Sequence, residues 1–181
     1  IRDRATNEED KEWPTEMYAA SKLAGENVIH GYAASGGLEY VILRLATFYG
    51  PSMRKSLAIY RFFDQALSDS PITIDDDGNQ TRSFVYIDDV VDAVLLAIKT
   101  PHINTTFNIS GFEEITMLDL AKKIINVSGS GSHINFGTKR KGQIRRSWID
   151  IARARTRFGW TPKVTIDEGL LRTYKWMKEV R

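Results

Sequence analysis

Residues 71–99 read PITIDDDGNQTRSFVYIDDVVDAVLLAIK, and this stretch predicts the fold class. It holds a β-rich run at 71–74, an Asp-Gly-Asn turn at 77–79 and a second β-rich run at 82–86. An apolar helix is expected at 88–99, because two carboxylates at its start favour the positive end of the helix dipole. Strands that alternate with helices in this way are typical of an α/β protein.

The same alternation continues on both sides of this stretch. Residues 1–16 are polar and predict a loop, and a helix is expected from about Met17 to Ala34, ended by two glycines. The apolar run at 40–45 predicts a buried parallel strand. Thr116 with Asp119 resembles a capping box for a helix that reaches Val127. The remaining predicted elements are helices at about 59–67, 150–158 and 166–180 and a strand at 106–109.

Length and composition exclude several classes of protein. A chain of 181 residues suits one domain and buries a sizeable core. It has no cysteine, which excludes disulfides, thiolate metal sites and cysteine nucleophiles and fits a cytoplasmic protein. No apolar run approaches the roughly 20 residues of a membrane span, so no membrane association is expected. The three histidines, His30, His102 and His133, are too scattered to predict a metal site.

Charge is distributed unevenly along the chain. Residues 1–119 carry 19 acids and 10 bases, whereas residues 120–181 carry 4 acids and 15 bases. This asymmetry favours a negatively charged partner, either nucleic acid, a membrane surface or a phosphorylated small molecule. No recognised nucleic-acid-binding motif is present, so we expect no nucleic-acid partner.

Tyr18 and Lys22 form the candidate catalytic pair. Positions i and i+4 share one face of a helix, so a phenol and an ammonium can point into one site. A nearby cation favours a phenolate, which is able to exchange a proton with a hydroxyl group. Tyr174 and Lys178 have the same spacing without supporting residues, and we interpret that second pair as structural.

Six short segments of the sequence, the first of which contains Tyr18 and Lys22, support the interpretation of this pair as catalytic. They are PTEMYAASKLAGE at 14–26, LRLATFYGP at 43–51, DGNQTRSFVYIDDV at 77–90, FNISG at 107–111, RKGQIRRSWID at 140–150 and FGWTP at 158–162. In this order they resemble the NAD-dependent epimerase/dehydratase family of extended short-chain dehydrogenases. The Gly-rich turn with which members of this family bind a dinucleotide is not among the 181 residues.

The resemblance implies the C-terminal part of a Rossmann-type parallel sheet together with a smaller α/β lobe that binds substrate. It implies a division into residues 1–50 with the catalytic helix and strand, 51–86 in the substrate lobe, 87–110 returning to the Rossmann-type part, and 111–181 mainly in the substrate lobe. A homodimer is expected for the intact enzyme, and the isolated chain is expected to be inactive.

The resemblance also assigns roles to individual residues. Tyr18 and Lys22 are expected to be catalytic, with NAD as the cofactor and a nucleotide sugar as the substrate. NAD is expected to contact Tyr18, Lys22, Leu45 and Phe48, and the substrate to contact Thr47, Arg82, Arg140 and Gln143. Two guanidinium groups suit a diphosphate, because each offers paired donors to phosphate oxygens. No metal is expected.

Three positions depart from the usual pattern of the family. Many members have asparagine at the position of Thr47, an aromatic residue at Asp75 and an acid at Gln143. These departures motivate an alternative, a reductase or hydroxysteroid-dehydrogenase-like enzyme on a non-nucleotide substrate. The leading hypothesis from the resemblance is a nucleotide-sugar epimerase or dehydratase, most similar to UDP-sugar 4-epimerases. For Arg82 a second interpretation is open, in which it forms an ion pair with Asp88 or Asp89 instead of binding the diphosphate. The other basic residues of the C-terminal third, among them Arg145 and Arg146, are expected to be solvated.

Overall fold

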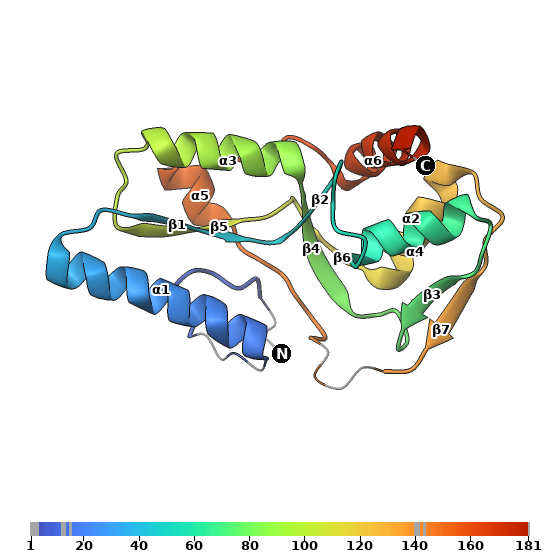
Figure 1. Ribbon diagram of the computed structural model, residues 1–181, viewed down its shortest axis with the longest axis horizontal. Helices are drawn as coiled ribbons and strands as arrows, with labels where there is room; N and C mark the ends of the chain where they lie inside the picture. Colours follow the sequence, from blue (N-terminus) through green and yellow to red (C-terminus); the bar gives the residue numbers. More distant parts are fainter. Residues whose placement is uncertain (1–3, 12–13, 15, 140–141, 143, 181) are drawn as a thin grey trace.

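The computed structural model describes residues 4–11, 14, 16–139, 142 and 144–180. Helices and strands alternate along most of this chain, as an α/β fold requires (Figure 1). The helices are α1 (Met17–Gly36), α2 (Ala58–Leu67), α3 (Ile87–Lys99), α4 (Met117–Ser128), α5 (Ala152–Arg157) and α6 (Ile166–Val180). The strands are β1 (Val41–Leu45), β2 (Thr47–Tyr49), β3 (Ile72–Asp75), β4 (Thr81–Tyr86), β5 (Thr105–Ile109), β6 (Glu114–Thr116) and β7 (Ile134–Gly137).

Most strand pairs are parallel. β1 pairs with β5, β2 with β4, and β3 with β7 in parallel, while β4 and β6 are antiparallel. Parallel neighbours need long crossover connections, which helices supply in this fold. In Figure 1, α1, β1, β5, α3 and α5 lie toward one end of the molecule and α2, α4, β3 and β7 toward the other, with β4 between them.

Two separate hydrophobic clusters form the core. The first joins α2, α4 and α6 to β3 and β4, and Phe63, Ile72 and Leu120 are completely buried within it. The second surrounds β5, where the rings of Phe107 and Phe158 stack with centroids 4.6 Å apart. Each large side chain buried in this way stabilises the fold by roughly 1.5–3 kcal/mol.

A buried carboxylate at the start of α3 fixes the approach to the last helix. Asp89 is 2% exposed, and its two oxygens accept hydrogen bonds from the backbone N–H groups of Lys163 and Val164 at 2.9 and 3.1 Å. The indole N–H of Trp160 donates to the carbonyl oxygen of Asp89 at 3.0 Å. The segment between α5 and α6 is thereby held against α3.

The long helices agree well with the sequence predictions. Residues 166–180 are helical as predicted, and the N-cap at Thr116 is confirmed, because its hydroxyl accepts a hydrogen bond from the N–H of Asp119 at 2.9 Å. The run at 40–45 does pair in parallel, but the prediction of a buried strand is wrong, since only Ile42 in β1 is buried. The short strands β2, β6 and β7 were not predicted.

Candidate active site

α1 carries the predicted catalytic pair on an open surface. The Lys22 ammonium nitrogen lies 5.3 Å from the centroid of the Tyr18 ring, one helical turn away. Tyr18 is 67% exposed and Lys22 is also exposed, so both are accessible to a bound molecule. The Ser21 hydroxyl donates to the carbonyl oxygen of Tyr18 at 2.8 Å. Gly37 caps the end of the helix, and its φ of 69° is in the left-handed region that favours glycine.

The second pair with this spacing has a different environment. The Lys178 ammonium lies 5.6 Å from the centroid of the Tyr174 ring, which is nearly the same geometry. However, Tyr174 stacks on Phe63 with centroids 6.3 Å apart, and its hydroxyl donates to the carbonyl oxygen of Ser128 at 3.3 Å. Tyr174 therefore packs against the first hydrophobic cluster, and access to a bound molecule distinguishes Tyr18 from it.

The junction of β1 and β2 exposes the other residues predicted near the cofactor. Leu45 is 39% exposed and Phe48 is 44% exposed, and Thr47 between them is exposed as well. Ala46 is buried, and its N–H donates to the carbonyl oxygen of Ile109 at 2.8 Å. The junction thus presents two apolar side chains and one hydroxyl at the carboxyl end of β1.

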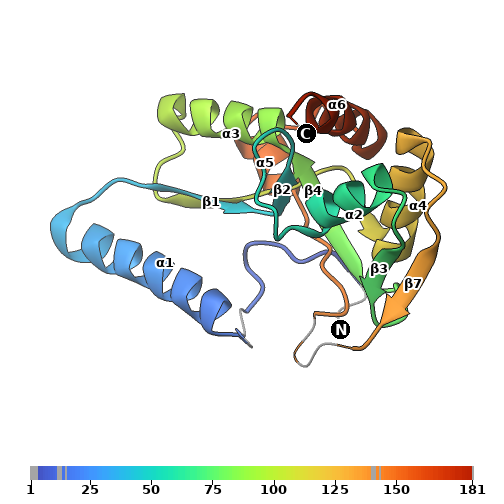
Figure 2. The same cartoon turned by 45° about the vertical axis from the view of Figure 1, so that its right-hand side comes forward.

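α1 and β1 run in opposite directions beside one another (Figures 1 and 2). The first turn of α1, which contains Tyr18, is consequently directed toward the end of the sheet at which β1 finishes. In open α/β sheets, ligands bind outside the carboxyl ends of the strands. Tyr18 and the junction at 45–48 occupy the part of the fold where such a ligand is expected.

Arg82 on β4 lies near the beginning of α1. Its Nη1 donates to the carbonyl oxygens of Thr81 and Ile144 at 2.7 and 2.8 Å. Burial lowers the pKa of Arg82, while the negative charge of Glu16, the residue before α1, opposes this shift. This charge interaction links Arg82 to the start of the helix that carries Tyr18.

The alternative pairing of Arg82 does not match these contacts. Asp88 forms an ion pair with Arg172 at 3.2 Å, and both oxygens of Asp89 accept backbone hydrogen bonds at the approach to α6. Arg82 instead uses its Nη1 to hold the carbonyl group at residue 144.

Two of the predicted substrate residues, Arg140 and Gln143, lie outside the described residues. Gly142 between them is described, with a φ of 79°. A Cβ atom built on Gly142 would lie 3.9 Å from a carboxylate oxygen of Glu16. Gly142 therefore lies near the start of α1, as Arg82 does.

The expectation that Arg145 and Arg146 are solvated is wrong. Arg145 forms two hydrogen bonds with the Asp77 carboxylate at 2.7 and 2.8 Å, and these hold the pKa of Asp77 well below its usual range. Arg146 binds both oxygens of Glu114 and lies over the ring of Trp148, 4.8 Å from the guanidinium carbon to the ring centroid. Arg145 fastens the segment after the basic loop to the turn between β3 and β4, and Arg146 fastens it to β6.

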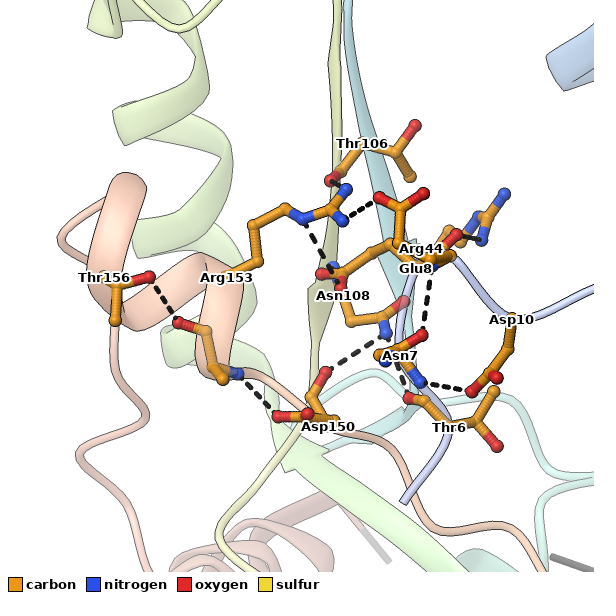
Figure 3. A network of polar contacts seen from close by, with 12 residues as sticks. Thr6, Asn7, Glu8, Asp10, Arg44, Thr106, Asn108, Asp150, Arg153 and Thr156 are labelled. Carbon is orange, nitrogen blue, oxygen red and sulfur yellow. Dashed lines mark hydrogen bonds and ion pairs between the residues drawn. The ribbon is translucent and has the colours of Figure 1, made fainter. Parts of the chain in front are cut away.

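A polar network near the amino end was not predicted from the sequence (Figure 3). The Glu8 carboxylate, 3% exposed, accepts a hydrogen bond from the N–H of Asn108 at 2.8 Å and lies 3.7 Å from the Arg153 guanidinium. The Asn108 side chain donates to the carbonyl oxygens of Thr6 and Asp150 at 3.3 and 3.1 Å. These partners are distant in the sequence, so no local pattern signals the network.

A cavity of about 170 Å³ lies away from these residues. Its lining is mainly aromatic and aliphatic and includes Tyr49, Phe84, Tyr86, Phe112 and Val164. Burial raises the pKa of Tyr49 far above its ordinary value. None of the residues that the sequence assigns to catalysis or binding contributes to this lining.

The described part of the chain contains neither a candidate metal site nor a candidate membrane span. Across those residues, no group of three or more His, Cys, Asp or Glu side chains is placed to hold a metal ion. None of the helices in the same residues combines the length and the apolar character that crossing a bilayer demands.

Comparison with known proteins identifies relatives of this chain. A UDP-glucose epimerase of Bacillus subtilis, itself described as uncharacterised, is 36% identical over 158 residues, which cover 87% of this chain and 50% of the relative. A UDP-glucuronate 4-epimerase of Thermodesulfobacterium geofontis is 31% identical and is matched over 92% of this chain and 51% of its own length. The chain thus spans about half the length of these curated relatives.

Solved structures show the same relationship. The UDP-glucose 4-epimerase of Thermotoga maritima, determined with UDP-glucose, superposes with a TM-score of 0.96 at 31% identity, over 99% of this chain and 59% of that one. The UDP-glucuronic acid 4-epimerase of Bacillus cereus, determined with UDP-glucuronic acid and NAD, gives a TM-score of 0.95 at 34% identity, over 99% and 58%. The sequence pattern of the NAD-dependent epimerase/dehydratase family matches residues 2–110. The chain therefore belongs to the NAD-dependent epimerase/dehydratase family.

Proposed function

We propose that this chain is the catalytic-helix and substrate-binding part of an NAD-dependent nucleotide-sugar 4-epimerase that acts on a UDP-sugar. The observation that carries the proposal is the exposed pair on α1, with the Lys22 ammonium 5.3 Å from the centroid of the Tyr18 ring. The relatives named above as 4-epimerases of UDP-sugars support this reaction and this substrate class.

The residues present fit one end of NAD. A nicotinamide riboside offers an apolar ring face and ribose hydroxyls, and the chain offers exposed apolar side chains at Leu45 and Phe48 and an ammonium donor at Lys22. The 181 residues contain no Gly-rich dinucleotide turn, so we assign only the nicotinamide riboside contacts to this chain. When bound, NAD would accept a hydride from the sugar carbon and return it.

Tyr18 moves the proton in this proposal. As a phenolate it would accept the proton of the sugar 4-hydroxyl and later return that proton to the same oxygen, while the C4 hydrogen would pass to NAD as hydride and come back to the opposite face. Lys22 places a positive charge beside the Tyr18 ring and would donate a hydrogen bond to a ribose hydroxyl of NAD. Thr47 donates one hydrogen bond to the substrate.

Arg82 and Arg140 bind the diphosphate of the substrate, with Gln143 near the ribose. Arginine stays charged in proteins, and the partial burial that lowers the pKa of Arg82 also strengthens the attraction of its guanidinium to a phosphate. Two guanidinium groups that bind one diphosphate would set its position relative to Tyr18.

The finer architecture belongs to the same proposal. Residues 1–50 and 87–110 contribute to a Rossmann-type sheet, while 51–86 and most of 111–181 form the lobe that holds the substrate. The intact enzyme is a cytoplasmic homodimer, and residues 1–181 alone are inactive because the remaining dinucleotide contacts are missing from them.

The test uses the product of the complete gene. Incubation with NAD and UDP-glucose, UDP-glucuronic acid or dTDP-glucose, followed by proton NMR, is expected to show the C4 epimer of a UDP-sugar. Loss of water from the sugar would indicate a dehydratase instead. If none of the three sugars is converted or raises the melting temperature, the nucleotide-sugar proposal is wrong, and a reductase acting on another class of substrate takes its place.

A further inference from the structure

α1 has little apolar packing to set its orientation. None of its residues is buried, although it is twenty residues long. An amphipathic helix is normally rotated into place by its apolar face. A polar contact can also set the rotation of a helix, and this matters for α1 because Tyr18 and Lys22 have to face the reacting molecule.

One ion pair supplies a contact on the same face as the catalytic pair. Tyr18, Lys22 and Glu26 are spaced at i, i+4 and i+8, so their side chains follow one another along one face of the helix. Arg44 on β1 binds the Glu26 carboxylate with two nitrogens, Nε at 2.9 Å and Nη2 at 2.6 Å. Both side chains are largely buried, at 25% and 16% exposure.

The geometry of this pair restricts rotation of the helix. A planar guanidinium that binds a carboxylate through two parallel hydrogen bonds fixes orientation as well as distance. If α1 turned about its axis, Glu26 would leave Arg44, and Tyr18 and Lys22 would turn by the same angle.

Arg44 is itself held by the network shown in Figure 3. Its Nη1 donates to the carbonyl oxygen of Glu8 at 3.4 Å. The buried Glu8 carboxylate is fixed by the N–H of Asn108 on β5 and by Arg153 on α5. Arg153 also pairs with Glu9 and donates to the carbonyl oxygen of Thr106 at 3.3 Å. The sheet and α5 thus meet at Glu8, whose carbonyl oxygen accepts the hydrogen bond from Arg44.

We propose that Arg44 is a positioning residue that sets the orientation of Tyr18 and Lys22 through Glu26. The inference rests on the proposed function for its effect on turnover, and on the contacts above for its effect on the helix. It assigns no contact between Arg44 and substrate or cofactor.

The first test compares kinetic constants in the product of the complete gene. Glu26→Gln removes the charge but keeps the size, and kcat is expected to fall by roughly 10- to 100-fold, since small misplacements of a reacting group have effects of this size. KM for the sugar nucleotide is expected to stay within about twofold, because binding is assigned to other residues. Arg44→Lys keeps the charge without the planar fork and is expected to give an intermediate kcat. Glu39→Gln, an exposed carboxylate in the loop before β1, is the control and is expected to leave kcat unchanged.

The second test does not depend on turnover. The same protein labelled with 3-fluorotyrosine gives a fluorine resonance for Tyr18, assigned by its loss in Tyr18→Phe. Glu26→Gln and Arg44→Lys are expected to shift or broaden this resonance and to leave that of Tyr174 unchanged.

Each outcome decides the proposal. An unmoved Tyr18 resonance, or a wild-type kcat in Glu26→Gln, overturns it. A parallel loss of kcat, sugar binding and melting temperature also overturns it, because that result describes a merely structural ion pair. If the wild-type protein converts no sugar, the proposed function fails, and the fluorine resonance alone decides whether Arg44 orients the helix.

Discussion

The Tyr18 ring and the Lys22 ammonium lie 5.3 Å apart on the open face of α1, whereas in the pair with the same spacing the Tyr174 ring packs against the core and only Lys178 is exposed. The two pairs have nearly equal internal geometry and different surroundings. This contrast gives each prediction about Tyr18 an internal control in the same molecule.

Tyr18→Phe is expected to lower kcat by about 10²- to 10⁴-fold, because it removes the group that exchanges a proton with the sugar hydroxyl. The dissociation constant of the nucleotide sugar, measured by calorimetry, is expected to stay within about threefold. Tyr174→Phe is the matched control. It is expected to keep wild-type kcat and to lose about 1 kcal/mol of unfolding free energy with its hydrogen bond to Ser128. A wild-type kcat in Tyr18→Phe would refute the mechanism.

Arg82→Gln is expected to raise KM for the nucleotide sugar by about 10- to 100-fold, since a hydrogen bond to a charged group contributes about 1.5–3 kcal/mol. The measurement is the dependence of initial rate on substrate concentration, and kcat is expected to change much less. Arg145→Gln is the control, because Arg145 is engaged by Asp77. An equal rise of KM in both variants would show that Arg82 has no specific role in binding.

Glu114 is expected to make stability depend on pH in the acid range. Its hydrogen bonds from Arg146, with a smaller contribution from Thr81, lower its pKa from the ordinary value of 4.5. A carboxylate with a lowered pKa stabilises the folded state above pH 4.5, and this contribution disappears as pH falls through the lowered value.

Urea unfolding of wild type and Glu114→Gln checks this expectation. The difference in unfolding free energy is expected to be about 1 kcal/mol at pH 6, discounted for partial exposure, and to shrink as the pH is lowered through the acid range. Glu113→Gln, at an exposed neighbouring position, is the control. A difference that stays constant with pH would contradict the assignment.

Gly169 in α6 and Gly25 in α1 are expected to respond to alanine in opposite ways. A Cβ atom at Gly169 would lie 2.1 Å from the Tyr49 hydroxyl oxygen, whereas at Gly25 it would meet nothing within 4 Å. Gly169→Ala is expected to lose about 1–3 kcal/mol of unfolding free energy through overpacking. Gly25→Ala is expected to gain about 0.5–1 kcal/mol, because alanine is the better helix former. Equal melting temperatures for the two variants would argue against this packing of α6 on Tyr49.

Local patterns in the sequence predicted those helices and caps that are determined by interactions between near neighbours in the chain. The helix at 166–180 and the N-cap at Thr116 follow from periodicity and from residues three positions apart, and both are observed. β6 and β7 contain only three and four residues and depend on partners far along the chain, so a local pattern does not signal them.

The same distinction applies to charged residues. Arg145 pairs with Asp77, which is 68 residues away in the sequence, and Arg146 pairs with Glu114, which is 32 residues away. Because neither partner is a near neighbour in the sequence, local patterns suggested that both arginines are solvated. Motifs identified the family and the Tyr18–Lys22 pair, but the environment that separates this pair from Tyr174 and Lys178 required the fold.

Asn108 has a consequence for the order in which the chain folds during its synthesis. It joins Glu8, at a separation of 100 residues, to Asp150, at a separation of 42, and Arg153 completes the same network. Closing such long loops is slow compared with forming a helix. On the ribosome, α1 therefore emerges before its last partners: its helical turns form as they emerge, but the network around Glu8 and Arg44 is completed only when α5 has left the exit tunnel.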